Sequence, residues 1–193
     1  MISTVVLAAG RSRQPAKHNL PLPLEDKPAL QWILENVLAS AVDEVICIAD
    51  DLAAARREIN IIDRRLIWHL NTAAGQAQST AVIAGLWASH PESAGVMFVA
   101  AEPPFVRKEL INALIERFAK SPASIVAASI RDQPPNPILF RRDLYPELLT
   151  LTGDDRGLSL LERHIEKTAL VEWQEYLSSM NRHRRYARFK EQV

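Results

Sequence analysis

The sequence predicts an α/β fold: a Rossmann-like, three-layer α/β/α sandwich with a mostly parallel sheet. Two observations predict it. Short apolar segments with β-branched residues alternate with segments of helical period, and the helical segments carry their apolar residues on one face. A chain of 193 residues can bury a continuous core without disulfides or metal, so we expect a single domain over residues 1–193.

The expected strands are short apolar runs. In chain order they cover Thr4–Ala8, Glu44–Ala49, Leu66–His69, Val96–Ala100, Ser124–Ala128, Pro137–Phe140 and Ala169–Trp173. The sixth belongs to the segment "RDQPPNPILF", which holds three of the chain's twelve prolines within four residues. Because proline lacks the amide donor that an inner strand needs, this segment predicts a rigid loop that enters an edge strand.

Two core-facing helices are expected from apolar stripes at helical spacing. In "PALQWILENVLASA" the stripe contains Leu30, Ile33, Leu34, Val37 and Leu38, and Pro28 suits the first turn. In "VRKELINALIERFAK" it contains Leu110, Ile111, Leu114, Ile115 and Phe118. These stripes predict core packing and imply no cofactor site.

Composition limits the partners and the compartment. Lys plus Arg and Asp plus Glu both total 23, so no net charge draws the chain to nucleic acid or to an anionic membrane. The single cysteine, Cys47, lies in the apolar run "EVICIAD" and is expected to be a buried core residue outside any disulfide. No window of 18 apolar residues and no signal-peptide pattern occur, so we expect a cytoplasmic protein.

The loop after the first strand, "LAAGRSRQPAK", occupies the place where α/β proteins often bind phosphate. Its small residues Ala8–Gly10 allow a ligand to approach the backbone, whose free amides can form an anion-binding nest. Arg11, Arg13 and Lys17 supply three positive charges that can clamp a triphosphate. The same features also describe many surface loops, and the spacing matches neither the P-loop nor the dinucleotide-binding pattern.

This loop resembles the LAAGxSxRMGxxK signature of sugar-nucleotide-type nucleotidyltransferases, which is followed by a leucine-rich stretch and G-K-P-L. The matching positions are Leu7–Gly10, Ser12, Leu20, Lys27 and Pro28. The similarity continues across nearly the whole chain and is greatest to the molybdenum cofactor cytidylyltransferases, whose relatives include molybdopterin guanylyltransferases and CDP-methylerythritol synthases. It implies the fold of the nucleotide-diphospho-sugar transferases.

Two later segments extend the resemblance. "HLNTAAGQAQSTAVIAGL" is similar to the family's N-P-x-x-x-x-G-x-x-S-S segment and keeps Asn71, with the hydroxyl pair Ser79 and Thr80 at an expected helix start. "PPNPILFRRDLYPELLTLTGDDRGLSLLERH" is similar to the family's G-H-P-V-L-F, F-P-E-L-L and G-D-x-G-x-x-x-L-L run. In it Asn136 stands where the family has a histidine in the region that recognises the acceptor.

The resemblance implies transfer of a nucleoside monophosphate, with CMP from CTP as the favoured pair, to a phosphorylated acceptor such as molybdopterin, with release of pyrophosphate. Leu7 and the backbone amides from Ala8 through Ala9 and Gly10 to Arg11 would hold the triphosphate. Asn71, Ser79 and Thr80 would line the base and ribose, and Asn136 would contact the acceptor. A molybdoenzyme is a further expected partner. The alternative is a catalytically decayed protein of this fold that binds nucleotide or a cofactor precursor without chemistry.

The alternative arises because the first loop departs from the family pattern. Gln14 replaces an arginine, Ala16 a glycine, and Asn19 the lysine that binds phosphate. Asn19 can still donate a hydrogen bond to the nucleotide but brings no charge. Lys17 can reach the same space on its flexible stem, which makes Lys17 and Arg11 the expected catalytic cations, unless Lys17 is an ordinary surface residue.

The metal ligands depart similarly. The resemblance implies Mg2+, and Glu102 stands where the family has an aspartate, while Asn181 is the nearest ligand at the second carboxylate position. Arginines 182, 184 and 185 follow, either replacing metal charge or forming the solvated face of a terminal helix. The five histidines show no ligand spacing, so neither zinc nor haem is expected.

Overall fold

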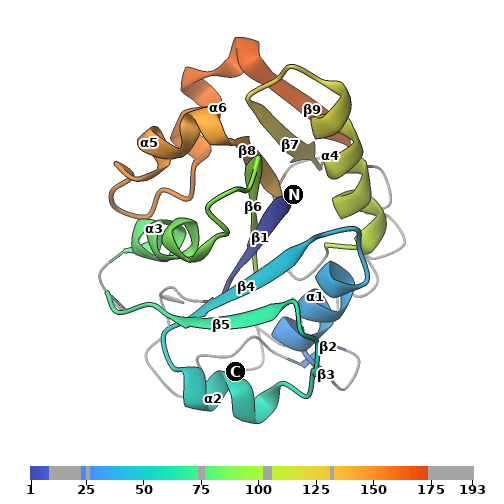
Figure 1. The fold of residues 1–193 in the computed structure, drawn as a ribbon, viewed down its shortest axis with the longest axis vertical. Coiled ribbons are helices and arrows are strands. Elements are labelled where there is room, and N and C mark those ends of the chain that lie inside the picture. The colour runs from blue at the N-terminus through green and yellow to red at the C-terminus, as the bar shows by residue number, and fades with distance from the viewer. Residues whose placement is uncertain (9–22, 25–26, 74–76, 102–105, 131–132, 174–193) are drawn as a thin grey trace.

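The computed structural model describes residues 1–8, 23–24, 27–73, 77–101, 106–130 and 133–173 (Figure 1). Seven described strands form one sheet. They are β1 Ile2–Leu7, β4 Glu44–Ala49, β5 Leu66–Leu70, β6 Gly95–Ala100, β7 Ile125–Ser129, β8 Ile138–Arg141 and β9 Thr168–Glu172. Every expected strand is therefore present, with its ends displaced by at most two residues. A short separate hairpin pairs β2 Pro23–Leu24 with β3 Lys27–Pro28.

The sheet is mostly parallel, in the order β5-β4-β1-β6-β8-β7-β9. β1 lies between β4 and β6 and pairs with both in parallel. β8 is antiparallel to both of its neighbours. The carboxyl ends of β1, β4, β5 and β6 therefore meet at one edge, together with the start of β8.

The prediction that Pro137–Phe140 enters an edge strand is wrong, because β8 lies between β6 and β7. The prolines at 134, 135 and 137 all precede β8, so every residue of Ile138–Arg141 keeps its amide donor. Ile138, Leu139 and Phe140 are all buried, as an inner strand requires. The prolines remove amide donors from the approach to the strand and not from the strand itself.

Helices cover both faces of the sheet (Figure 1). One face carries α1 Ala29–Leu38 and α4 Lys108–Lys120, whose predicted stripes are buried except for the half-buried Ile115. The other face carries α3 Gln78–Ala88, α5 Tyr145–Leu148 and α6 Leu158–Arg163. The α2 helix, Leu52–Glu58, contacts β5. None of the described helices is long and apolar enough to cross a membrane.

Two arginines close the carboxyl ends of the helices on the first face. Arg65 donates from Nη2 to the carbonyl of Leu38 at 2.7 Å. Arg141 donates from Nη2 to the carbonyls of Phe118 and Ser121, both at 3.0 Å, and its guanidinium lies 4.0 Å from the centre of the Phe118 ring. A cation at this end of a helix satisfies terminal carbonyls and complements the helix dipole.

Replacing Thr4 by valine should stabilise the protein. Thr4 is fully buried in β1, and its Oγ1 has no hydrogen-bond partner within the described part of the chain. Valine keeps the shape and removes the unpaired hydroxyl, so we expect the free energy of unfolding to rise by about 1 kcal/mol. Urea unfolding measures it. Thr4→Ala, which also deletes the methyl group, should be destabilised; a valine variant less stable than wild type would contradict the assignment.

The Asp63–Arg65 pair should make stability depend on pH below neutrality. Hydrogen bonds from the Arg65 side chain and amide lower the pKa of Asp63 to about 2, from an ordinary value of 3.8. A depressed carboxyl pKa stabilises the folded state above the unfolded-state pKa, and the stabilisation is lost as pH falls through the folded-state pKa. The stability difference between wild type and Asp63→Asn should therefore be constant above about pH 5 and disappear toward about pH 2. Denaturant midpoints across this range measure it, and a difference independent of pH would contradict the pairing.

Candidate functional site

The predicted site residues within the described part of the chain lie along the carboxyl edge of the sheet. Leu7 ends β1, and Asn71 directly follows β5. Asn136 lies shortly before β8, whose antiparallel direction brings its start to the same edge. Ligands of open α/β sheets bind at this edge, so the topology supports the choice of region.

Asn71 is the centre of a hydrogen-bonded cluster between β4, β5 and α3. Its Nδ2 donates to Asp50 Oδ1 at 3.1 Å and to Thr80 Oγ1 at 3.2 Å, and its Oδ1 accepts from the Ala73 amide at 3.2 Å. Thr80 in turn donates to the carbonyl of Ala77 at 2.7 Å. The structure thus brings Asn71 and Thr80 together. Both amide hydrogens of Asn71 are occupied, so the side chain holds the edge in shape and offers a ligand little beyond its oxygen.

Ser79 is buried at the start of α3, as the hydroxyl pair predicted, but the amides there are occupied. The Ser79 amide donates to the carbonyl of Gly153 at 3.1 Å, and the Gln78 amide reaches Asp154 Oδ1 at 3.4 Å. The loop before α6 therefore caps α3. A phosphate has no free amides at this helix start.

The Ala8 amide does not take the phosphate-binding role expected of it. It donates to the carbonyl of Ile48 at 3.0 Å and approaches the carbonyl of Val6 at 3.2 Å, which continues the pairing of β1 with β4 by one residue. A donor used in the sheet is not available to a ligand. The expected nest of amides can therefore begin only at Ala9. Ala9, Gly10, Arg11, Lys17 and Asn19 lie outside the described residues.

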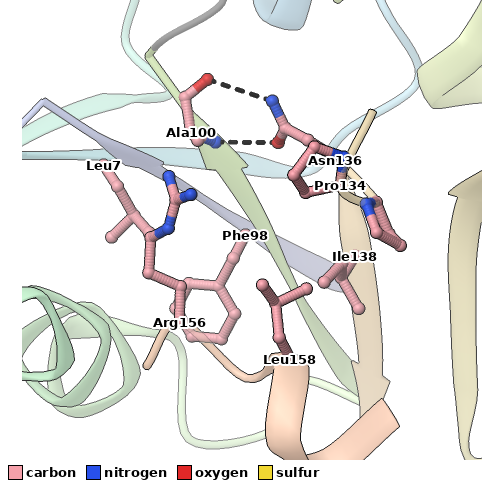
Figure 2. Close-up of a pocket in the computed structure, with 9 residues that line it drawn as sticks. Leu7, Phe98, Ala100, Pro134, Asn136, Ile138, Arg156 and Leu158 are labelled. Atoms are coloured by element: carbon pink, nitrogen blue, oxygen red, sulfur yellow. Dashed lines mark hydrogen bonds between the residues drawn. The ribbon is translucent and has the colours of Figure 1, made fainter. Parts of the chain in front are cut away.

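A pocket opens at the same edge, where β1, β6 and β8 meet (Figure 2). It is partly open to solvent and has a cavity volume of about 50 Å3. Its lining is mostly apolar, with two polar side chains, Asn136 and Arg156. The apolar residues are Leu7, Phe98, Ala100, Pro134, Pro135, Ile138 and Leu158.

Asn136 fastens the proline-rich loop to the end of β6. Its Oδ1 accepts from the Ala100 amide at 2.9 Å, and its Nδ2 points to the Ala100 carbonyl at 3.4 Å (Figure 2). The side-chain amide takes the place that a neighbouring strand would take. Asn136 thus lies in the pocket at the expected acceptor region, and its contacts fix the end of β6 at Ala100.

Arg156 lines this pocket and was not among the predicted site residues. Its loop, "GDDRG", is fixed on both sides of the arginine. Asp155 Oδ1 accepts from the Gly157 amide at 2.8 Å, and Gly157 has a φ of 99° with no room for a side chain, since a Cβ there would lie 2.7 Å from Cζ of Phe140. Clustered aspartates and glycines are typical of turns, and they are the local signal that this segment offers. Nothing local indicated that its arginine meets β1 and β6.

The structure gives no described metal site. Within the described ranges no group of three or more His, Cys, Asp and Glu side chains could hold an ion. Glu102 and Asn181, the predicted Mg2+ ligands, lie outside those ranges, as do the C-terminal arginines. Cys47 is fully buried, and burial raises the pKa of its thiol, so it is unsuited to nucleophilic chemistry.

Comparison with known proteins identifies the family. The MobA-like NTP transferase domain matches residues 4–169, from β1 to the second residue of β9. The chain belongs to this family. The match confirms the resemblance drawn from the first loop. The chain is therefore a member of a nucleotidyltransferase family.

The individual relatives described here are each at most 27% identical to this chain in sequence. The MobA-like chain is 27% identical over 165 residues to the purine catabolism protein PucB of Bacillus subtilis, covering 82% of this chain and 79% of PucB. Rv0371c of Mycobacterium tuberculosis is 23% identical, with a TM-score of 0.75 over 90% of this chain and 89% of that one. Rv0371c has also been solved in complex with manganese. Molybdopterin-guanine dinucleotide biosynthesis protein A of Archaeoglobus fulgidus is 18% identical, with a TM-score of 0.61 over 89% and 83% of the chains. These likenesses to solved structures confirm the predicted fold.

Replacing Asn136 by alanine should destabilise the protein because it leaves the Ala100 amide and carbonyl without their partner. We expect a loss of about 1–3 kcal/mol in the free energy of unfolding. Chemical denaturation measures it, with Asn60→Ala as the control, since Asn60 is exposed and its side chain makes no hydrogen bond to the described residues. A loss equal to that of the control would contradict the fastening role.

Proposed function

We propose that the protein is a nucleotidyltransferase that moves a nucleoside monophosphate, with CMP from CTP as the favoured pair, to a phosphorylated small-molecule acceptor such as molybdopterin. One observation carries the proposal: the family match extends from β1 to the start of β9 and so includes every strand that forms the ligand-binding edge. A single domain over residues 1–193 would suffice for this reaction.

The reaction has a simple balance. An acceptor phosphate oxygen attacks the α-phosphorus of the nucleotide, the bond from that phosphorus to the bridging oxygen breaks, and pyrophosphate leaves with its electron pair. Little covalent chemistry is required of the protein, so its work is positioning and stabilisation of negative charge. From the sequence we assign the triphosphate to the amides of residues 9–11, with Arg11 and Lys17 as the cations and Asn19 as a neutral donor.

The described residues contribute the rigid framework around the proposed substrate sites. Asn71 holds β4, β5 and α3 together, so it positions the base and ribose side, where Ser79 and Thr80 lie. Asn136 fixes the end of β6 on the acceptor side. Mg2+, when bound, would neutralise triphosphate charge. We assign it to Glu102 and Asn181 from the sequence alone, and no step here depends on it.

The second candidate is a protein that binds nucleotide or cofactor precursor without catalysis. The replacement of three family charges favours it, because the loss of one positive group that stabilises the transition state commonly costs several powers of ten in rate. The similarity to a purine catabolism protein is compatible with either candidate, each of which could serve a molybdoenzyme partner.

Nucleotide binding and pyrophosphate release distinguish the candidates. Calorimetry with Mg2+ and each nucleoside triphosphate should show binding with CTP preferred, and adding an acceptor-containing extract should release pyrophosphate. Binding without release in the presence of acceptor would favour the binding protein. If no nucleoside triphosphate binds at about millimolar concentration, a level near the upper end of ordinary substrate affinities, the enzyme and the nucleotide-binding form of the second candidate are both excluded.

The Lys17→Ala variant tests the assigned cation within the same assay. A charge that acts chiefly in the transition state should lower kcat by about a hundredfold or more while changing nucleotide affinity much less. An equal and small effect on both quantities would remove Lys17 from the reaction.

A further inference from the structure

We propose that two copies of this chain associate through β5, the outer strand of the sheet beside α2, by pairing β5 with itself in the antiparallel direction. The partner is a second copy of this chain, placed by a two-fold axis that passes beside the middle of the strand. The inference concerns the assembly of the protein and holds whether or not the proposed function is correct.

One backbone edge of β5 points away from the sheet. β5 is the last strand at one end and pairs with β4 alone among the described strands (Figure 1). The carbonyl of Arg65 and the amide of Asn71 both bond β4, each at 2.9 Å. Because alternate residues of a parallel strand bond the same neighbour, the peptide groups of residues 66, 68 and 70 point outward. Outside the pairing with β4, no hydrogen bond joins the backbone of Trp68 or Leu70 to any described residue.

The side chains of β5 do not protect this edge. Sheet edges that remain single are commonly shielded by charged side chains, by proline or by a covering element. β5 contains no Lys, Arg, Asp, Glu or Pro, and none of its residues is buried. α2 contacts β5 but leaves the side chains of Ile67 and Leu70 43% and 42% exposed. β9, the opposite outer strand, ends in the exposed Glu172. β5 is therefore the edge that can accept another strand.

The outward groups of β5 are complementary to themselves. A two-fold axis beside Trp68 overlaps the two strands along their whole length and sets outward peptide groups opposite each other. The Trp68 amide of each copy then donates to the Trp68 carbonyl of the other, and the Leu70 amide donates to the Leu66 carbonyl of the other. The Leu66 amide needs no partner, because it donates to the carbonyl of Asp63 at 3.0 Å. Leu66 also faces Leu70 of the other copy, so apolar side chains cover each other.

The charges of α2 fit the same two-fold axis. α2 precedes β5 and contacts it, with Asp51 exposed at its start and Arg56 and Arg57 exposed in its last turn. An axis perpendicular to the sheet that sets β5 antiparallel to itself also sets α2 antiparallel to α2 of the other copy. The acidic start of each helix then approaches the basic end of the other, and the helix dipoles oppose each other. This surface is therefore complementary in charge to itself.

Apolar side chains beside β5 supply further area. Specific interfaces bury about 800 Å2 on each partner, which is more than one short strand provides. Ile62, between α2 and β5, is 100% exposed, and Trp87 on α3 is 74% exposed. Trp87 lies two turns along α3 from Thr80, which bonds Asn71 at the end of β5, so Trp87 is on the β5 side of that helix. Both side chains therefore belong to the surface around this edge.

Sedimentation equilibrium of the full chain tests the association. Wild type should form a dimer. Ile67→Lys should raise the dissociation constant by about a hundredfold or more, because a charge on the paired strand has to be desolvated when the second copy binds. Leu170→Lys is the matched control and should leave the dimer unchanged, since Leu170 is an exposed apolar residue of the opposite outer strand.

A charge reversal on α2 tests the placement of the two helices. Arg57→Glu should weaken the dimer about tenfold, and by less at high salt, because the axis repeats the contact. Arg117→Glu, which makes the same change in the last turn of α4, should not weaken it. Equal effects of the two reversals would overturn the antiparallel arrangement.

Amide hydrogen exchange separates strand pairing from other modes of association. The amides of Trp68 and Leu70 should exchange slowly in the wild-type dimer and quickly in Ile67→Lys. A wild type that is monomeric at about 0.1 mM overturns the proposal, and slow exchange in that monomer would mean that the edge is filled from within the chain. A dimer that persists in folded Ile67→Lys, that Leu170→Lys dissociates equally, or whose two amides exchange quickly also overturns it. Circular dichroism verifies that each variant is folded.

Discussion

The pairing of β1 with two parallel neighbours is the constraint on which the site depends. Every residue from Ile2 to Leu7 is buried, and β1 is in register with β4 on one side and β6 on the other. Three strands consequently end together, and the loops that follow them open on one edge. The bond from the Ala8 amide to Ile48 extends this pairing to the last described position before the first loop. α3 lies close above β1, since any side chain at Gly85 would collide with Val5.

Two asparagines maintain that edge where strand pairing stops. Asn71 joins the end of β5 to Asp50 and to the start of α3, and Asn136 joins the loop before β8 to the end of β6. Each uses a side-chain amide, which carries a donor and an acceptor, in place of a backbone peptide. From sequence, both were expected to contact ligand. A residue at a given motif position can either contact the ligand or shape the edge of the sheet. The motif alone does not distinguish these two roles.

Local pattern predicted the strands, the two apolar stripes and the helix start at Ser79, because each is a property of neighbouring residues. It failed where the outcome depends on distant ones. The place and direction of β8 follow from pairing with β6 and β7, whereas the three prolines before it indicated an edge strand. The arginine caps on α1 and α4 join residues far apart in the chain. Arg156 also lines the pocket through packing between distant parts of the chain. For that reason it was not among the site residues predicted from sequence.

The distribution of charge around the edge bears on whether chemistry survives in this chain. The first loop has Asn19 in place of the family lysine, and the predicted metal ligands include one neutral residue, so we expect weaker stabilisation of a triphosphate. Positioning of the acceptor is a separate contribution to rate, because holding two reactants in line replaces an encounter in solution. Arg156 lines the pocket at this edge from a fixed turn, so a positive side chain remains beside β1 and β6 although Asn19 has replaced the family lysine.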